Sequence, residues 1–90
     1  MDKKTVIAAK YSFKRKQRKL PVNCFDRFKL RTLRINAGIS QYKLAMEANV
    51  EFAAICRIEK GVQGPSFPTV VSFARYFNVP VEEFIMAGVF

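Results

Sequence analysis

Histidine and tryptophan are absent from the 90 residues, and cysteine occurs only twice, at Cys24 and Cys56. Without histidine the chain cannot build a His-based general acid or base, or a Ser/His/Asp or Cys/His nucleophile site. Two cysteines alone cannot complete the usual four-ligand zinc patterns. These absences argue against an ordinary hydrolase or metalloenzyme, so we expect a protein that is not an enzyme and that holds no cofactor.

Long apolar runs are also missing. The longest one near the N-terminus, residues 6–9, is much shorter than the roughly 7–15 residues of a signal-peptide core. No stretch approaches the roughly 18 apolar residues of a membrane span. We therefore expect no membrane partner and a cytoplasmic protein whose cysteines are reduced thiols.

Acidic residues are few, and the basic excess is unevenly distributed. The chain has 16 Lys and Arg against 7 Asp and Glu, a net charge of +9. Residues 1–20 hold eight basic residues and one acidic residue, a net of +7, whereas residues 21–90 hold eight and six, a net of +2. We therefore divide the chain into a basic N-terminal arm, residues 1–20, and one domain, residues 21–90. The excess of positive charge indicates a polyanionic partner.

The arm is compatible with three arrangements: a disordered tail, an arm on the DNA backbone or in the minor groove, or a segment ordered against the first helix. Its residues 5–13 include several apolar side chains, which favours anchoring of that stretch. The basic run that follows is then available to phosphate groups. Its members are Lys14, Arg15, Lys16, Arg18 and Lys19.

The spacing of apolar and capping residues predicts an all-α domain of five short helices. They are expected at about 24–37, 41–48, 51–60, 67–77 and from residue 80 onward. The expected N-caps are Asn23, Ser40 and Ser66, and the expected stops are Gly38, Asn49, Gly61 and Asn78. The first helix has a second apolar stripe, including Phe28 and Ile35, for which we expect a cover from the arm or a dimer partner.

The second and third helices are separated by a turn of three or four residues. This is the spacing of a helix-turn-helix, expected here at about residues 40–60, in which one helix braces another against DNA. Spacing alone is a weak signal, because any helical bundle contains short turns.

Individual residues strengthen the prediction. The chain resembles the Cro/repressor-type, or xenobiotic-response-element, family of helix-turn-helix domains, whose fold is lambda-repressor-like. The resemblance covers roughly residues 25–86 and does not extend to the arm. It is carried by Arg34, Gly38, Ser40, Gln41, Leu44, Ala45, Val50, Ile55, Ile58, Glu59, Gly61, Pro65, Ser66 and residues 77–80.

The resemblance implies roles for several positions. Phe52, Ala53 and Arg57 correspond to positions that face base edges in the major groove, and Arg57 is the best candidate because its planar fork suits guanine. Arg34 and Glu59 correspond to a partly buried structural ion pair. The positions expected to meet phosphate are Gln41, Tyr42, Lys43 and Lys60, together with the arm residues Lys14, Arg15, Lys16, Arg18 and Lys19.

The outer face of the third helix departs from the family pattern. Members of the family usually carry polar residues there, and a small hydroxyl residue where Glu51 stands. Phe52 and Ala53 cannot hydrogen-bond a base, although either can touch a thymine methyl group. Glu51 repels phosphate and is a candidate acceptor for cytosine N4 if the helix is shifted.

The expected function is a sequence-specific transcriptional regulator that binds double-stranded DNA, a repressor acting by operator occupancy. No small-molecule ligand is expected, since no separate sensing domain fits in the chain. The family commonly binds paired half-sites, so we expect a homodimer, with Phe84, Ile85, Val89 and Phe90 as the candidate dimer surface. The alternative for this apolar C-terminal stretch is that it is part of the core. The alternative is a protein-interaction module on the same fold, antitoxin-like or an accessory subunit, with Tyr42, Phe52 and Ala53 as its contact patch.

Overall fold

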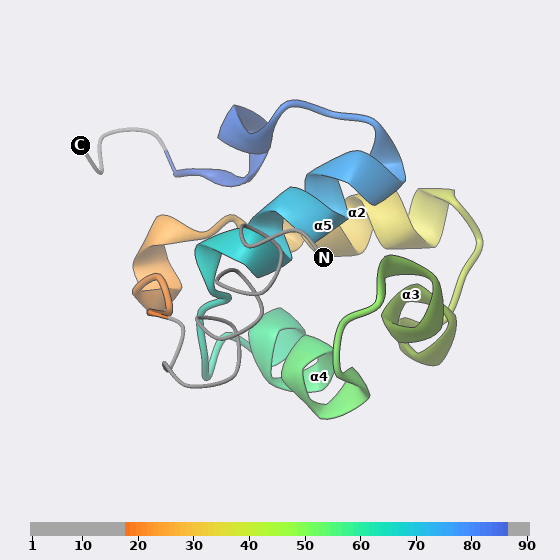
Figure 1. Ribbon diagram of the computed structural model, residues 1–90, viewed down its shortest axis with the longest axis horizontal. Coiled ribbons are helices and arrows are strands. Elements are labelled where there is room, and N and C mark those ends of the chain that lie inside the picture. Colours follow the sequence, from red (N-terminus) through yellow and green to blue (C-terminus); the bar gives the residue numbers. More distant parts are fainter. Residues whose placement is uncertain (1–17, 87–90) are drawn as a thin grey trace, which may run out of the picture.

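The computed structural model describes residues 18–86, which form a helical domain with no strand within that range. In chain order the elements are the 3₁₀ turn η1 (Val22–Cys24), the helices α2 (Arg27–Asn36), α3 (Gln41–Ala48), α4 (Phe52–Lys60) and α5 (Phe67–Phe77), and the 3₁₀ turn η2 (Val81–Phe84). Helix α4 packs against α2 and α3, whereas η2 packs against α2 and α5 (Figure 1). The predicted all-α, lambda-repressor-like class is confirmed.

The helix ends follow from the capping residues. Ser40 accepts a hydrogen bond from the Lys43 amide at 3.0 Å, and Ser66 accepts one from the Thr69 amide at 3.4 Å. Asn49, Gly61 and Asn78 end their helices with positive φ angles of 58°, 81° and 57°. These three stops lie at the predicted positions, because asparagine and glycine adopt the left-handed conformation at low cost.

The first helix begins three residues later than the sequence indicated. We expected it at Cys24 with Asn23 as its cap, whereas it begins at Arg27 and Asp26 is the cap, accepting from the Lys29 amide at 3.0 Å. The reason is a long-range contact: Phe25 is extended and forms an antiparallel bridge with Ile85. An extended residue cannot be part of a helix.

The prediction of a fifth α-helix from residue 80 onward is also wrong in detail. It is the single 3₁₀ turn η2, after which Ile85 is extended (φ −99°, ψ 127°). The Phe84 carbonyl accepts from the Asp26 amide at 2.7 Å, and the Cys24 carbonyl accepts from the Met86 amide at 3.0 Å. These bonds hold the segment after η2 extended and prevent the turn from lengthening into an α-helix.

One hydrophobic core lies between the helices. Its fully buried side chains come from every helix and from η2, and include Leu30, Leu44, Ile55, Ile58, Val70, Phe73 and Phe84. Phe25, Phe73 and Phe84 meet as an aromatic cluster, with ring centroids 5.5–6.3 Å apart. The core supports α4 on its inner face only, and the other face of α4 is exposed to solvent.

Candidate nucleic-acid interface

Glu59, near the end of α4, is the centre of a buried polar network. Its carboxylate accepts two hydrogen bonds from the Arg34 guanidinium of α2, at 2.7 and 3.0 Å, and one from the Gln41 amide of α3 at 3.0 Å. The side chains of Glu59 and Arg34 are only 5% and 13% exposed. The two parallel bonds between Arg34 and Glu59 have a strong directional preference. Together with the bond from Gln41, they fix α4 against both α2 and α3.

Further bonds extend this network. Arg34 also donates to the Ile39 carbonyl at 2.9 Å, and Arg27 donates to the Glu59 carbonyl at 2.8 Å. The Cys56 thiol donates to the Gln41 side-chain oxygen at 3.3 Å. Cys56 is thus half-buried between α3 and α4 and does not stand free on the outer face of the helix.

The outer face of α4 carries Phe52, Ala53, Arg57 and Lys60, all of them exposed. These include the three residues expected to face bases. The helix is rigid from its inner side, where Ile55 and Ile58 are buried in the core. Helix α4 therefore carries exposed side chains on one face while its opposite face is packed in the core.

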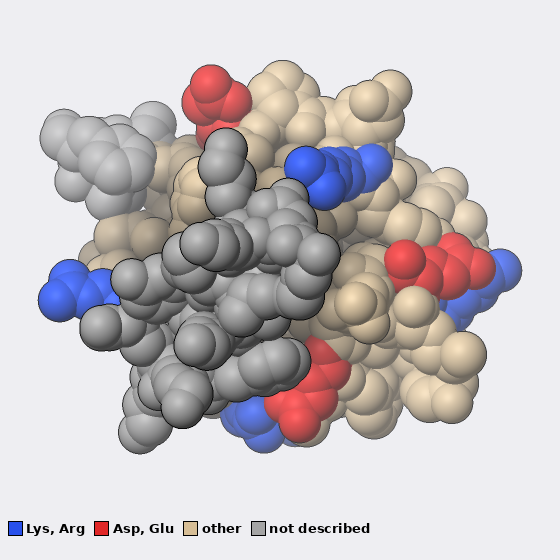
Figure 2. Space-filling view, in the orientation of Figure 1, with Lys and Arg blue, Asp and Glu red and all other residues tan. Residues whose placement is uncertain are grey.

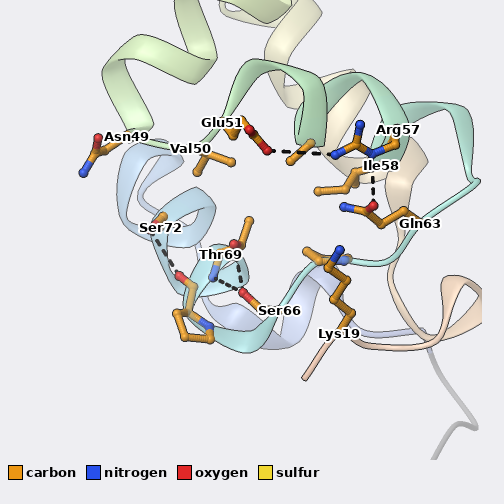
Figure 3. Close-up of a pocket in the computed structure, with 13 residues that line it drawn as sticks. Lys19, Asn49, Val50, Glu51, Arg57, Ile58, Gln63, Ser66, Thr69 and Ser72 are labelled. Carbon is orange, nitrogen blue, oxygen red and sulfur yellow. Dashed lines mark hydrogen bonds and ion pairs between the residues drawn. The ribbon is translucent and has the colours of Figure 1, made fainter. Parts of the chain in front are cut away.

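Arg57 is held from two sides (Figure 3). Its Nε donates to the Gln63 side-chain oxygen at 3.0 Å, and its Nη2 lies 3.9 Å from a Glu51 carboxylate oxygen. The Arg57 side chain is still 47% exposed, so the pairing with Glu51 contributes little to stability. What the two neighbours do provide is a preferred direction for the guanidinium plane.

Comparison with known proteins agrees with this geometry. A family model described as helix-turn-helix matches residues 30–84, which include α3, α4 and the Arg34–Glu59 ion pair. The chain belongs to this helix-turn-helix family. The resemblance to xenobiotic-response-element regulators is thereby confirmed, and the protein is a DNA-binding regulator of transcription in this general sense.

The fold also has a solved relative. The restriction-modification controller protein C.AhdI from Aeromonas hydrophila is similar with a TM-score of 0.59 and 24% sequence identity, over 63% of this chain and 86% of that chain. At this identity the likeness shows the shared fold. A search of curated proteins finds no match.

Within the helix-turn-helix unit, α3 is the bracing helix. Gln41, expected to donate to phosphate, uses one amide N–H for Glu59 and keeps a second one. The first amides of an α-helix have no partner inside the helix, and Ser40 satisfies only that of Lys43. The start of α3 therefore retains donors for an anion.

The other expected phosphate residues lie at separate places. Tyr42, Lys43, Lys60, Arg18 and Lys19 are all exposed, and Lys43 lies 3.9 Å from Glu47 on the same helix. Lys14, Arg15 and Lys16 lie outside the described residues. On the face in Figure 2 the lysine and arginine side chains are dispersed and several stand beside a carboxylate, consistent with the small charge of the domain.

Two exposed aromatic side chains are in contact at the N-terminal ends of α3 and α4. The rings of Tyr42 and Phe52 are 5.8 Å apart in an edge-to-face arrangement. Tyr42 is 61% and Phe52 45% exposed. The DNA-binding interpretation of the sequence assigned the two residues to phosphate and to bases separately, whereas the alternative of a protein-interaction module placed them in one contact patch.

The candidate dimer surface requires a correction. Phe84 is fully buried in the aromatic cluster and cannot be part of a surface in the folded protein. Ile85 is half-buried, and Val89 and Phe90 lie outside the described residues. For Phe84 the dimer-surface prediction is wrong and the core alternative is right; the sequence could not separate them because the apolar C-terminal stretch has no periodicity that separates a core-facing residue from an exposed one.

Tyr76 of α5 carries a perturbed phenol. Its hydroxyl donates to the Glu47 carboxylate of α3, and this hydrogen bond raises the pKa of Tyr76, with a smaller effect from desolvation. The phenol thus remains protonated and links α5 to α3.

None of the helices within residues 18–86 has the length and apolar character needed to cross a bilayer.

Proposed function

We propose that the protein is a sequence-specific repressor that binds double-stranded DNA with α4 in the major groove and acts by occupying its operator. The observation that carries this proposal is the asymmetry of α4. Its inner face is fixed by the core and by the Glu59 network, and its outer face offers the exposed Arg57. The similar fold of a restriction-modification controller protein supports a regulatory role.

Arg57 is the proposed base reader. A guanidinium can donate two parallel hydrogen bonds to guanine O6 and N7. In Arg57 the bond to Gln63 uses only the Nε–H, so the N–H groups of the two terminal nitrogens can still donate to a base. Phe52 and Ala53 would then contact thymine methyl groups. Glu51 would accept from cytosine N4, since a carboxylate next to the DNA backbone is repelled by phosphate.

The phosphate contacts are assigned to the start of α3, through Gln41, Tyr42 and Lys43, and to Lys60 at the end of α4. The arm residues 14–19 would add sequence-independent attraction, because the folded domain itself carries little net charge. A homodimer would set two copies of α4 about one turn of DNA apart, ~34 Å. Ile85, Val89 and Phe90 remain the candidates for its surface.

Replacing Arg57 by alanine tests the base-reading role. Binding to DNA from the protein's own promoter is expected to weaken about 5- to 150-fold, the equivalent of roughly 1–3 kcal/mol for one bidentate contact. Affinity for random duplex and its salt dependence should change by no more than the loss of one positive charge causes. Both are measured by titration of labelled duplexes across a salt series, with Arg75→Ala, an exposed arginine of α5, as the matched control. Equal wild-type affinity for the two duplexes would refute the operator reader.

Neutralising three arm residues tests the phosphate role of the basic run. In the full chain, Lys14→Gln, Arg15→Gln and Lys16→Gln together should reduce the slope of log affinity against log salt by up to about 2.7, at ~0.9 for each phosphate that is no longer neutralised. The control is Arg31→Gln with Arg75→Gln, two exposed arginines of α2 and α5. An unchanged slope in the triple variant would show that the run does not touch phosphate.

The second candidate function is a protein-interaction module. It is favoured by the exposed edge-to-face pair of Tyr42 and Phe52, with Ala53 beside it, because aromatic residues are typical anchors of protein interfaces. Phe52→Ala separates the two functions, because Phe52 is not assigned to phosphate. The repressor should keep its random-DNA affinity in this variant, whereas an interaction module that does not bind DNA would show none before or after the change.

A further inference from the structure

Gln63 lies in the loop between α4 and α5, six residues after Arg57 in the chain. Both residues line a groove of about 630 Å³ between these two helices, and there the Gln63 side-chain oxygen accepts from the Arg57 Nε at 3.0 Å (Figure 3). Gln63 is half-buried, whereas the Arg57 side chain is 47% exposed. The hydrogen bond therefore joins an exposed arginine to a partner that is itself better packed.

The loop that carries Gln63 is held by a distant part of the chain. The Leu20 amide donates to the Pro65 carbonyl at 2.8 Å, two residues after Gln63. Gly64 allows this close approach, because a Cβ atom at that position would overlap the Leu20 carbonyl oxygen. The backbone next to Gln63 is thus held in place from outside the helix-turn-helix unit, so its side-chain oxygen is a fixed acceptor for Arg57.

The hydrogen bond to Gln63 determines which edge of the Arg57 guanidinium is left for a base. A guanidinium has two pairs of parallel N–H groups: one pair includes Nε, and the other belongs to the two terminal nitrogens. Gln63 uses the Nε–H, so a two-bond contact to guanine must use the terminal pair. Nη2 is 3.9 Å from Glu51, beyond the usual 2.7–3.2 Å of a hydrogen bond, so Glu51 does not occupy its N–H groups.

We infer that Gln63 is a positioning residue that determines specificity through Arg57, an inference that rests on the proposed function. It holds the guanidinium by its Nε, so that the two terminal nitrogens are the ones that reach the base. Without this acceptor, the Glu51 carboxylate draws the guanidinium toward the N-terminal end of α4. The arginine side chain also regains rotamer freedom, which DNA binding must then remove.

Arginine side-chain NMR of the full chain without DNA tests the contact itself. Gln63→Met removes the acceptor while it keeps the length and the charge of the side chain. Exchange of the Arg57 Nε proton with water should become severalfold faster in this variant, because the hydrogen bond that protects it is lost. Val62→Met changes the neighbouring loop residue, which is 65% exposed, and should leave this exchange unchanged. Equal exchange rates in the wild type and Gln63→Met would overturn the inference.

DNA titration then tests the effect on specificity. Gln63→Met should weaken binding to DNA from the protein's own promoter about 2- to 12-fold, the equivalent of ordering one flexible side chain, and leave affinity for random duplex unchanged. In a chain that already carries Arg57→Ala, the same substitution should have no further effect, because Gln63 acts through Arg57. A further loss in that chain, or an equal loss on both duplexes, would mean that Gln63 contacts DNA directly and would overturn the inference.

The same titrations separate a failure of this inference from a failure of the proposed function. If the wild type binds both duplexes equally, the operator reader is refuted, and the positioning role of Gln63 is refuted with it. If Arg57→Ala weakens operator binding and Gln63→Met does not, only the inference about Gln63 is overturned.

Discussion

Replacing Glu59 by alanine is expected to lower the free energy of unfolding by about 3–5 kcal/mol. The substitution removes the only carboxylate that pairs with Arg34 within the described residues, and the Arg34 side chain is 13% exposed. An uncompensated charge then remains in a largely dry site, and Gln41 loses its acceptor as well. The loss is measured by urea unfolding followed by helical circular dichroism.

A double replacement provides the matched control. Arg34→Met with Glu59→Met removes both charges and fills the space with apolar groups, so it should cost much less than Glu59→Ala alone. The comparison separates the penalty of one buried charge from the value of the pair. A loss below about 1 kcal/mol for Glu59→Ala would mean that water reaches Arg34 in the folded protein and screens it.

The same variant has a consequence for DNA. Glu59 joins α4 to α2 through Arg34 and to α3 through Gln41, so its removal releases both restraints on the helix proposed to read bases. We expect operator affinity to fall more than affinity for random duplex. Sequence readout depends on the position of Arg57, whereas non-specific attraction depends on total charge.

The sequence predicted the elements whose ends are determined locally. Ser40, Asn49, Gly61 and Ser66 mark their helix ends through bonds or backbone angles within a few residues, so a local pattern suffices to find them. The start of the first helix was missed because it depends on Ile85, which lies 60 residues away along the chain from Phe25. No local signal reports such a bridge.

The site shows the same division. The Arg34–Glu59 ion pair could be proposed from the family resemblance, and both residues lie in the expected positions. The role of Gln63 beside Arg57 could not, because it stands in a loop with no periodicity. The hydrogen bond between Cys56 and Gln41 could not be predicted either, because it depends on how closely α3 and α4 approach each other.

Phe84→Ala is expected to destabilise the protein by about 3–5 kcal/mol, the usual cost of removing a buried phenylalanine. The ring is fully buried, stacks on Phe25 at 5.5 Å and lies 6.3 Å from Phe73. The cavity would open under η2, where the Phe84 carbonyl also holds the start of α2 through Asp26. Thermal unfolding should show a matching fall in Tm.

Two controls distinguish a core role for Phe84 from a role in a dimer surface. Phe67→Ala makes the same change at a residue that is 56% exposed, and it should alter stability by about 0.5 kcal/mol or less. If Phe84 acts within one chain, its effect on Tm is the same at low and high protein concentration. An effect that depends on concentration would return Phe84 to the dimer interface, because subunit association contributes to stability by mass action.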